Sequence, residues 1–425
     1  MDFLDELLWR GLLKDCTDEQ RLRDHLASGA RRAYCGFDPT ADSLTIGNLV
    51  PIMLLVHFAR AGHEPVVVMG GGTGLIGDPS GKSAERQLMT GETVQQNVDA
   101  QRPIFERVFA GAGQPAPMIR NNLDWLGKVS YLEALRDIGK HFSVNMMIQK
   151  DSVKARLTER DQGISYTEFS YMILQSYDFL KLYQDEGVTI QLGGSDQWGN
   201  IVGGADLIRR VETDDAKSFG MTAPLVTKAD GGKFGKTETG AVWLTPERTS
   251  SYAYYQFWLN AADADVFNFL RTFTLHTKDE IEALEAAHQE APGKREPHRA
   301  LARAATELLH GREQMELAEK AGKALFSGEL ADLPEGTLRE VFAEVPSSEH
   351  ERSSLDEGLD PVALLVSTGL AKSNREAREF LGNGSVSVNG TKIDAETTLD
   401  ASRLLHGSLM AIRRGKKSWH LTRWA

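Results

Sequence analysis

The sequence is short of cysteines, of long apolar runs and of positive charge, and each shortage excludes a class of protein. Its 425 residues include two cysteines, Cys16 and Cys35, too few for a disulfide framework or a zinc cluster. The longest apolar run, Leu49 to Val56, has eight residues and contains Pro51, whereas a membrane-spanning helix needs about 20. The N-terminus is acidic where a secretory signal is basic. We therefore expect a cytoplasmic protein with no membrane partner and no structural metal.

The shortage of positive charge is uneven along the chain. The whole sequence has 48 Lys and Arg against 60 Asp and Glu, a net charge of −12. Residues 361–425 carry ten against five, or +5, so the preceding residues carry 38 against 55, or −17. The acidic body argues against a general nucleic-acid coat. The basic end is typical of a polyanion-binding module, although a solvated basic terminus is the alternative.

The remaining composition is that of a globular protein, with 41% hydrophobic and 25% charged residues. Collagenous, disordered and low-complexity classes are therefore excluded. A chain of this length rarely forms one core, so two to four domains are expected.

The first half reads as part of a parallel sheet. Residues 33–37 predict a buried strand, 48–61 a helix and 65–69 a second strand. Strand, crossover helix and strand imply a parallel pair. Open parallel sheets bind ligands at the carboxyl ends of their strands, so the loops at 38–48 and 70–82 are candidate site segments.

A second set of elements follows a polar insertion, expected to be mostly helical, at about 83–165. Ser165 and Glu168 form a capping-box pattern that predicts a helix start. A strand is expected at 188–192, and it ends in the polar run 193–198.

The predicted helix carries Tyr171, Gln175 and Asp178 on one face, at positions i, i+4 and i+7. A solvent-facing stripe is the simple interpretation, and a row of ligand-binding groups is the alternative.

The last part of the chain divides into three segments. Residues 249–325 have a helical pattern, 331–360 lose periodicity and are interpreted as a linker, and a basic domain begins near Pro361. We expect the aromatic residues at the start of the helical part to pack a core rather than stack on bases: Tyr252, Tyr254, Tyr255, Phe257 and Trp258.

Two phosphate-binding patterns fail on inspection. The glycines of 72–77 fit the dinucleotide pattern, but Asp78 and Pro79 block the helix that should follow. A P-loop ending at Gly81 needs a glycine where Ile76 stands. The loop at 227–237 carries three lysines among glycines, which suits a polyphosphate, although a solvated turn is the simple alternative.

Four motifs occur together and in order, and their combination resembles the bacterial tyrosyl-tRNA synthetases, which are class I enzymes. They are Tyr34-Cys35-Gly36-Phe37-Asp38-Pro39-Thr40-Ala41-Asp42-Ser43-Leu44, Gly77-Asp78-Pro79-Ser80-Gly81-Lys82, Gly193-Gly194-Ser195-Asp196-Gln197-Trp198-Gly199-Asn200 and Lys233-Phe234-Gly235-Lys236-Thr237. The resemblance covers essentially the whole chain.

The resemblance implies an α/β fold with a doubly wound parallel-sheet (Rossmann-like) catalytic domain, then an α-helical domain and a small basic α+β RNA-binding domain. The expected boundaries are 1–226 for the catalytic domain, 227–248 for a mobile lysine loop, 249–330 for the helical anticodon-side domain, 331–360 for the linker and 361–425 for the RNA-binding domain.

The implied activity is that of a tyrosine–tRNA ligase. It activates L-tyrosine with ATP, releases pyrophosphate, and transfers tyrosine to the terminal adenosine of tRNA(Tyr). Tyr34 and Asp178 would bind the phenolic hydroxyl. Tyr171, Gln175 and Asp78 would hold the ammonium, with Gln191 nearby.

ATP is implied as a substrate complex with Mg²⁺, without a prosthetic group. A carboxylate nucleophile is already ionised, so no general base is needed, and catalysis is expected to rest on positioning and charge stabilisation. The residues implied for ATP are Cys35, Asp38, Thr40, Thr45, Gly47, Asn48, Lys82, Arg86, Asp196, Gln197, Lys233, Lys236 and Thr237.

One position departs from the family. The ATP motif commonly begins with histidine, and here Thr45 stands in its place, followed by Ile46, Gly47 and Asn48. Threonine has a shorter side chain with one donor, and losing a well-placed donor costs roughly 10²–10³ in rate.

The implied partners are tRNA(Tyr) and a second copy of the chain in a homodimer. The candidate tRNA-binding residues are Lys150, Arg156, Arg209, Arg210, Lys372, Arg375, Arg413, Arg414, Lys416 and Lys417. Two alternatives remain. A tryptophanyl-tRNA synthetase would lack the pair of Tyr34 and Asp178 and the basic end domain, and a decayed paralogue would bind RNA without forming an adenylate.

Overall fold

The computed structural model describes residues 2–78, 88–150, 153–154, 164–232, 234–237, 240–343, 345–415 and 418–425. The chain forms two compact units. The first unit comprises Met1–Ser250 and Trp258–Gly311, and the second comprises Ser251–Phe257 and Arg312–Ala425. Within the described residues, no helix combines the length and apolarity needed to cross a membrane.

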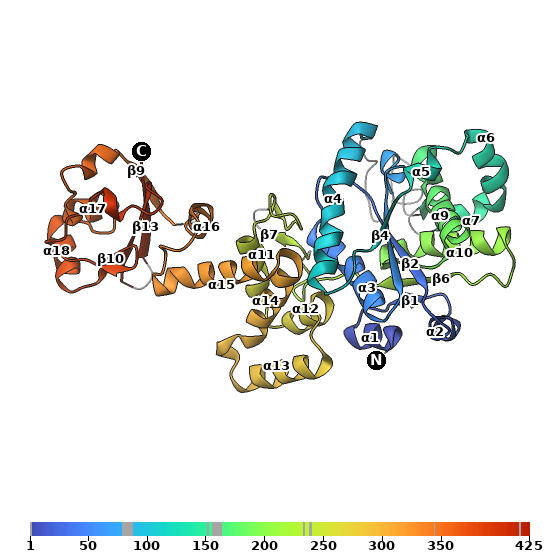
Figure 1. Ribbon diagram of the computed structural model, residues 1–425, viewed down its shortest axis with the longest axis horizontal. Coiled ribbons are helices and arrows are strands. Elements are labelled where there is room, and N and C mark those ends of the chain that lie inside the picture. The colour runs from blue at the N-terminus through green and yellow to red at the C-terminus, as the bar shows by residue number, and fades with distance from the viewer. Residues whose placement is uncertain are drawn as a thin grey trace. The chain divides into compact units, whose positions relative to one another are not determined.

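The first unit is built on a six-stranded sheet with the order β1-β6-β5-β2-β3-β4 (Figure 1). All neighbours are parallel except β1, which is antiparallel to β6. The chain runs outward from β2 through β3 to β4 and then returns to β5 and β6, so the doubly wound α/β prediction is confirmed. The strands are β1 (Asp15–Cys16), β2 (Arg32–Phe37), β3 (Glu64–Met69), β4 (Met118–Asn121), β5 (Val188–Gly194) and β6 (Phe219–Ala223).

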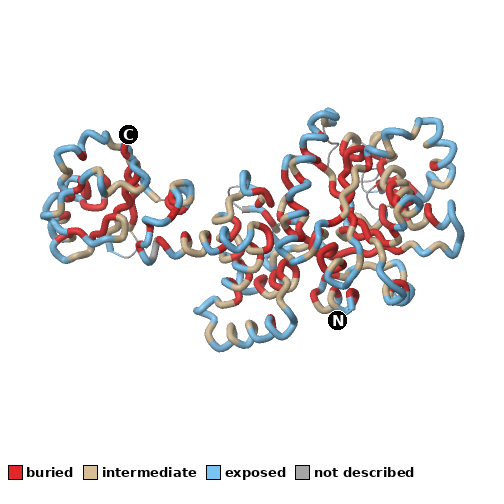
Figure 2. The backbone as a smooth tube through the Cα atoms, viewed as in Figure 1, coloured by how far each residue is buried: buried red, intermediate tan, exposed pale blue. Residues whose placement is uncertain are grey.

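Helices cover the sheet because its strands are apolar on both faces. Helix α3 (Leu49–Arg60) packs on β2, β3, β5 and β6 and is buried along most of its length (Figure 2). Tyr34, Val66 and Val68 belong to a core cluster with residues of α9 (Tyr166–Glu186) and α10 (Trp198–Val211). Side chains therefore leave β2 toward α9, the helix that carries the predicted polar stripe.

The helix predicted after Ser165 is α9, and the Ser165 hydroxyl accepts from the Glu168 amide at 3.2 Å. The interpretation of 83–165 as an insertion between the halves of the sheet is wrong in part. Helix α4 (Gly91–Gly111) and β4 lie there, and β4 is an edge strand of the main sheet. Its four residues are all half-buried, so the sequence carries no strong apolar signal. Short helical segments follow: α5 (Leu123–Leu126), α6 (Tyr131–Glu133), η3 (Ala134–Ile138), η4 (Gly139–His141) and α7 (Val144–Ile148).

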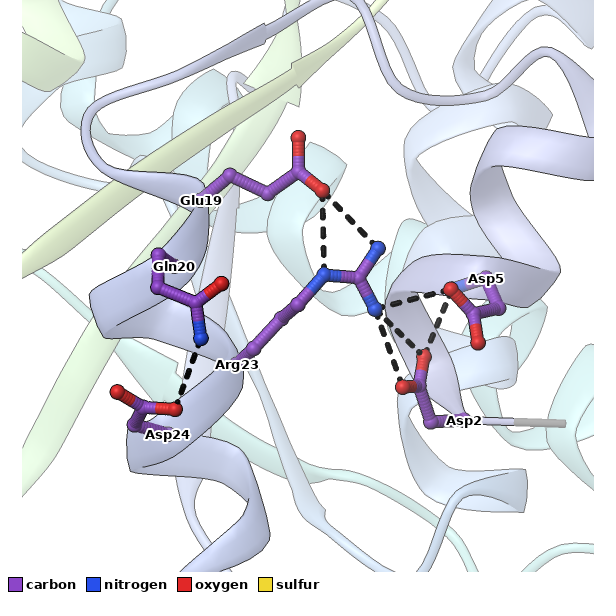
Figure 3. Close-up of polar contacts among 6 residues, drawn as sticks. All are labelled: Asp2, Asp5, Glu19, Gln20, Arg23 and Asp24. Atoms are coloured by element: carbon purple, nitrogen blue, oxygen red, sulfur yellow. Dashed lines mark hydrogen bonds and ion pairs between the residues drawn. The ribbon is translucent and has the colours of Figure 1, made fainter.

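Two N-terminal helices are joined by one arginine. Arg23 on α2 (Glu19–Ala27) forms ion pairs with Asp2 at 3.1 Å, Asp5 at 2.9 Å and Glu19 at 3.0 Å, and the first two flank the start of α1 (Phe3–Arg10; Figure 3). At the other end of α1, Arg10 is fully buried and donates to the carbonyls of residues 271, 274 and 276. Helix α1 is thus held at one end to α2 and at the other to the end of α12 (Val266–Phe273).

The helical segment does not form one separate domain. Helix α11 (Ser251–Leu259) spans the division between the units, α12, α13 (Lys278–Glu290) and α14 (Glu296–His310) belong to the first unit, and α15 (Arg312–Ser327) belongs to the second. Core packing is confirmed for three of the predicted aromatics, Tyr254, Tyr255 and Trp258, which are 2% exposed or less.

The second unit contains a five-stranded sheet with the order β11-β10-β12-β13-β9. The predicted linker at 331–360 is wrong, because this segment forms α16 (Glu335–Val341) and β9 (Ser347–His350), and β9 pairs with β13 in parallel. The apolar residues of this segment are few and scattered in the sequence, and they form a core only because they pack against the strands of the sheet. The other elements are α17 (Pro361–Ser367), α18 (Asn374–Gly382), β10 (Val386–Val388), β11 (Thr391–Lys392), β12 (Leu409–Arg414) and β13 (Ser418–Trp424).

Candidate active site

The candidate site lies at the carboxyl ends of β2 and β5, the neighbouring strands between which the direction of winding reverses. Such a switch point leaves a crevice between loops that diverge to opposite sides. Asp38 follows β2, Asp196 and Gln197 follow β5, and α9 supplies its polar face from one side.

Asp178 is a buried carboxyl of the site with a raised pKa. It is 3% exposed, and burial raises its pKa to about 7 against the lowering effect of two hydrogen bonds. Asn122 donates its side-chain amide to Oδ2 at 2.9 Å, and Trp125 donates its indole N–H to Oδ1 at 2.7 Å.

Tyr34 provides the second polar group of this pocket. Its hydroxyl is buried and has no hydrogen-bond partner among the described residues. Burial first, and the charge of Asp178 second, raise the pKa of this phenol well above its usual value. A buried hydroxyl left unpaired costs free energy, roughly 1–3 kcal/mol, so this position suits a ligand that supplies a polar partner.

Tyr171 belongs to a hydrogen-bond network that the sequence did not indicate. Its hydroxyl donates to Asp38 at 3.3 Å, and the Thr73 hydroxyl donates to the same carboxylate at 3.1 Å. Asn122 in turn donates to Thr73 at 2.9 Å. The structure therefore links Tyr171, expected near the tyrosine ammonium, to Asp38, expected at ATP.

Gln197 connects the remaining polar groups. Its amide nitrogen donates to Asp78 at 2.7 Å, and its oxygen accepts from Gln175 at 3.4 Å and from Asn200 at 3.2 Å. The side-chain oxygens of Gln175 and Gln191 are buried without a hydrogen-bond partner among the described residues. Both are acceptors that an ammonium group can satisfy.

The backbone approaches the site closely at Gly70. A Cβ there would lie 2.5 Å from Asp38 Oδ1 and 2.7 Å from Thr73 Oγ1. Any larger residue would push the two side chains apart, so the glycine after β3 is required by their hydrogen bond. Cys35 is buried on β2, and burial raises the pKa of its thiol to about 12, which keeps it protonated.

The turn at Thr45 lies beside the lysine loop. Ile46 N donates to Val242 O at 2.9 Å, and Val242 N donates to Gly235 O at 2.9 Å, so the turn is bridged to the residue before Lys236. The Thr45 amide and hydroxyl both donate to Asn48 Oδ1, at 3.0 and 2.9 Å. Lys236 and Thr237 form β7, which pairs with β8 (Gly240–Ala241).

The structure thus brings many of the predicted tyrosine and ATP residues together at the carboxyl ends of the strands. Thr40 lies two residues after Asp38, and Gly47 lies inside the Thr45 turn. Six predicted residues lie outside the described part of the chain: Lys82, Arg86, Arg156, Lys233, Lys416 and Lys417.

The predicted tRNA residues fall in both units. In the first, Lys150 donates to Gly199 O at 2.6 Å and burial lowers its pKa to about 8, Arg209 pairs with Asp206, and Arg210 donates to a backbone carbonyl. In the second unit Lys372 and Arg375 are exposed at the start of α18. Arg413 stacks on Trp419, and Arg414 stacks on Phe380 and donates to Leu370 O at 2.7 Å. Arg414 is therefore also a structural residue of its own domain.

Sequence reasoning missed Thr73, Asn122 and Trp125, which position Asp178 and Asp38. Asn122 immediately follows β4, at the same edge of the sheet as Asp38. A prediction of β4 as a strand of the main sheet would have placed Asn122 at the edge of the sheet where ligands bind.

Comparisons with known proteins agree with this geometry. Residues 27–327 match the family model of class I tRNA synthetases (W and Y), and residues 337–422 match the SYY-like C-terminal domain of tyrosine–tRNA ligases. A tyrosine–tRNA ligase of Aliivibrio fischeri is 51% identical over 100% of this chain and 99% of its own length, and one of Bacillus caldotenax is 50% identical over 100% of both. A C-terminally truncated mitochondrial tyrosyl-tRNA synthetase of Aspergillus nidulans aligns with a TM-score of 0.70 and 28% identity, covering 76% of this chain and 94% of that one.

Proposed function

Because the chain belongs to the class I tRNA synthetases of the tyrosyl and tryptophanyl family, we propose that it is a tyrosine–tRNA ligase. The observation that carries the choice of tyrosine is the buried, unpaired hydroxyl of Tyr34 beside the carboxyl of Asp178. A phenolic hydroxyl placed between them donates to the carboxyl and accepts from Tyr34. Phenylalanine would leave the Tyr34 hydroxyl buried and unpaired, and would bring Asp178 no donor beyond Asn122 and Trp125, and this penalty supplies the selectivity.

The ammonium of the substrate is bound at the other end of the pocket. Asp78 supplies negative charge, and the unpaired oxygens of Gln175 and Gln191 supply acceptors. Tyr171 completes this side through its contact with Asp38. The substrate then lies along the polar face of α9, with its carboxylate toward the carboxyl ends of β2 and β5.

ATP, which enters with Mg²⁺ as its counter-ion, occupies the loops beside that carboxylate. A carboxylate oxygen of tyrosine attacks the α-phosphorus, a new P–O bond forms, and the bond to the bridging oxygen breaks to release pyrophosphate. Lys236 and the Thr45 turn, bridged through Val242, lie on the pyrophosphate side and stabilise the developing charge. A hydroxyl of the terminal adenosine of tRNA(Tyr) then attacks the activated carbonyl, and AMP leaves.

The tRNA is bound by basic residues of both units. Lys372, which precedes α18, and Arg375 within it contact the tRNA, and Lys150, Arg209 and Arg210 lie near its acceptor end. Replacing Lys372 and Arg375 by alanine should lower kcat/KM for tRNA about tenfold and reduce the salt slope by about two. Pyrophosphate exchange should not change. Lys320 and Lys323 on α15 provide a control pair of equal charge in the same unit.

The chain acts as a homodimer in the cytoplasm. Large apolar side chains are exposed together on the segment around α6, α7 and the start of α9, which suits burial against a second copy. These residues are Tyr131, Leu132, Leu135, Val144, Met146, Ile148 and Tyr166.

The decisive test is tyrosine-dependent exchange of labelled pyrophosphate into ATP, with phenylalanine and tryptophan as controls. We expect exchange with tyrosine alone, which also establishes that Thr45 supports catalysis. A folded chain that binds tyrosine but catalyses no exchange would instead be a decayed RNA-binding paralogue.

A further inference from the structure

A cavity in the first unit is lined by Trp125, the residue whose indole donates to Asp178. It has a volume of about 730 Å³ and is enclosed by the β4–α5 segment, the helical segment 133–138 and the second half of α9. Trp125, Tyr177 and Leu180 line it. Tyr177 and Leu180 flank Asp178 in α9, and Trp125 is the indole that donates to Asp178.

The lining combines aromatic rings with an excess of negative charge. Five carboxylates and three cationic side chains face the cavity. Two of the cations are already paired, Arg120 with Glu186 and Lys181 with Asp185. The second carboxylate oxygen of Glu186 is buried and has no hydrogen-bond partner among the described residues, so it can accept from a ligand.

This chemistry selects one kind of ligand. Indole and phenol rings attract cations through their faces, and the neighbouring carboxylates strengthen the attraction. An apolar floor with Leu180, Val129 and Ile138 suits a hydrocarbon body rather than a bare metal ion. Asp124 and Asp137 are exposed side chains of the lining, and Asp137 also pairs with Arg136 at 2.7 Å, so an ammonium group beside Asp124 can remain partly hydrated.

We propose that this cavity binds a small organic cation with an apolar body, such as an alkylamine, and that its occupation tightens tyrosine binding through Trp125. A ligand against the indole restrains the ring and keeps its N–H directed at Asp178, whose carboxyl faces the substrate pocket. The coupling rests on the proposed function, because it assumes that Asp178 binds tyrosine. The cation site itself does not.

The binding test uses hexylammonium as the probe and 1-hexanol, which has the same chain without the charge, as its control. Methyl NMR of the full chain should show saturable shifts at Val129, Ile138 and Leu180, with a dissociation constant of about 1 mM for this small ligand. Hexanol should bind at least about fivefold more weakly. Absence of saturable shifts, or equal affinity for hexanol, would overturn the cation site.

Two double variants distinguish binding of hexylammonium at the cavity from attraction by the net charge of the protein. Asp124→Asn with Asp137→Asn removes two charges of the lining and should weaken hexylammonium about fivefold or more. Glu92→Gln with Asp99→Asn removes the same charge from α4, away from the cavity lining, and should change the affinity less than about twofold. Equal weakening in both variants would mean that the probe senses only net charge.

Coupling is measured as the tyrosine dissociation constant with and without saturating hexylammonium. We expect about threefold tightening, and by reciprocity tyrosine should tighten hexylammonium by the same factor. Trp125→Phe keeps a ring but removes the N–H, so it should retain the methyl shifts and lose the coupling. An unchanged tyrosine affinity in the wild type would refute the coupling. A chain that binds hexylammonium but not tyrosine would refute the proposed function and the coupling, while the cation site would stand.

Discussion

Asn122 donates its side-chain amide to Asp178 Oδ2 at 2.9 Å, although 56 residues separate the two in sequence. Its oxygen meanwhile accepts from the Gly72 amide at 2.7 Å, so one buried residue connects the loop after β3 to the polar face of α9. The loop and the helix are therefore positioned together.

Asn122→Ala should weaken tyrosine binding by about 1–3 kcal/mol, because Asp178 and the Gly72 amide both lose a buried partner. Equilibrium dialysis with labelled tyrosine measures the loss. Asn268→Ala, at an exposed position of α12, is the control and should bind tyrosine as the wild type does. Equal affinity in the two variants would remove Asn122 from this role.

The raised pKa of Asp178 predicts a pH dependence of stability. Burial raises its pKa from 3.8 to about 7 in the folded chain, so the folded state holds this proton more tightly than the unfolded state. Its contribution to stability is full below about pH 4 and is lost as the pH rises through about 7. Thermal unfolding between pH 5 and 8 should show this decline. Asp178→Asn, which cannot ionise, should flatten it, and an unchanged slope in that variant would assign the decline to other groups.

Lys236→Ala should slow adenylate formation while leaving tyrosine affinity nearly unchanged. The lysine is exposed on β7 beside the Thr45 turn. In the proposed mechanism it stabilises the negative charge that develops on pyrophosphate. Stopped-flow activation kinetics should show a fall of about tenfold or more. Lys278→Ala on α13 is the charge-matched control. A large loss of tyrosine binding in Lys236→Ala would contradict the ATP role.

A close backbone contact in the second unit, between Gly390 and Gly328, allows the packing of that unit to be tested by substitution. A Cβ at Gly390 would lie within van der Waals overlap of Gly328 O, and Gly390 also has φ of +83°. Gly390→Ala should therefore destabilise this unit, by about 1 kcal/mol or more. Gly382→Ala on α18, where an added Cβ meets nothing within 4 Å, should be neutral or stabilising. Differential scanning calorimetry compares the two, and equal melting temperatures would refute the contact.

Long, strongly patterned elements could be predicted from sequence. The strands β2, β3 and β5, the start of α9 and the basic character of the C-terminal segment follow from apolar runs, a capping pair and a charge count. Weak elements could not. β4 is a half-buried edge strand, and β9 has the residues Ser347, Ser348, Glu349 and His350, whose strand conformation comes only from pairing with β13.

The sequence by itself determined the family and the doubly wound α/β fold and supplied the candidate residues of the site, because motif spacing and local periodicity are properties of the sequence alone. Only the tertiary structure decided which way the polar face of α9 points, and that Asn122 and Trp125 hold Asp178. It also decided that 331–360 belongs to a folded domain. All three features depend on contacts between segments that are distant in the sequence. The free energy of such contacts comes from burial and from hydrogen-bond pairing, and neither burial nor pairing has a local signature in the sequence.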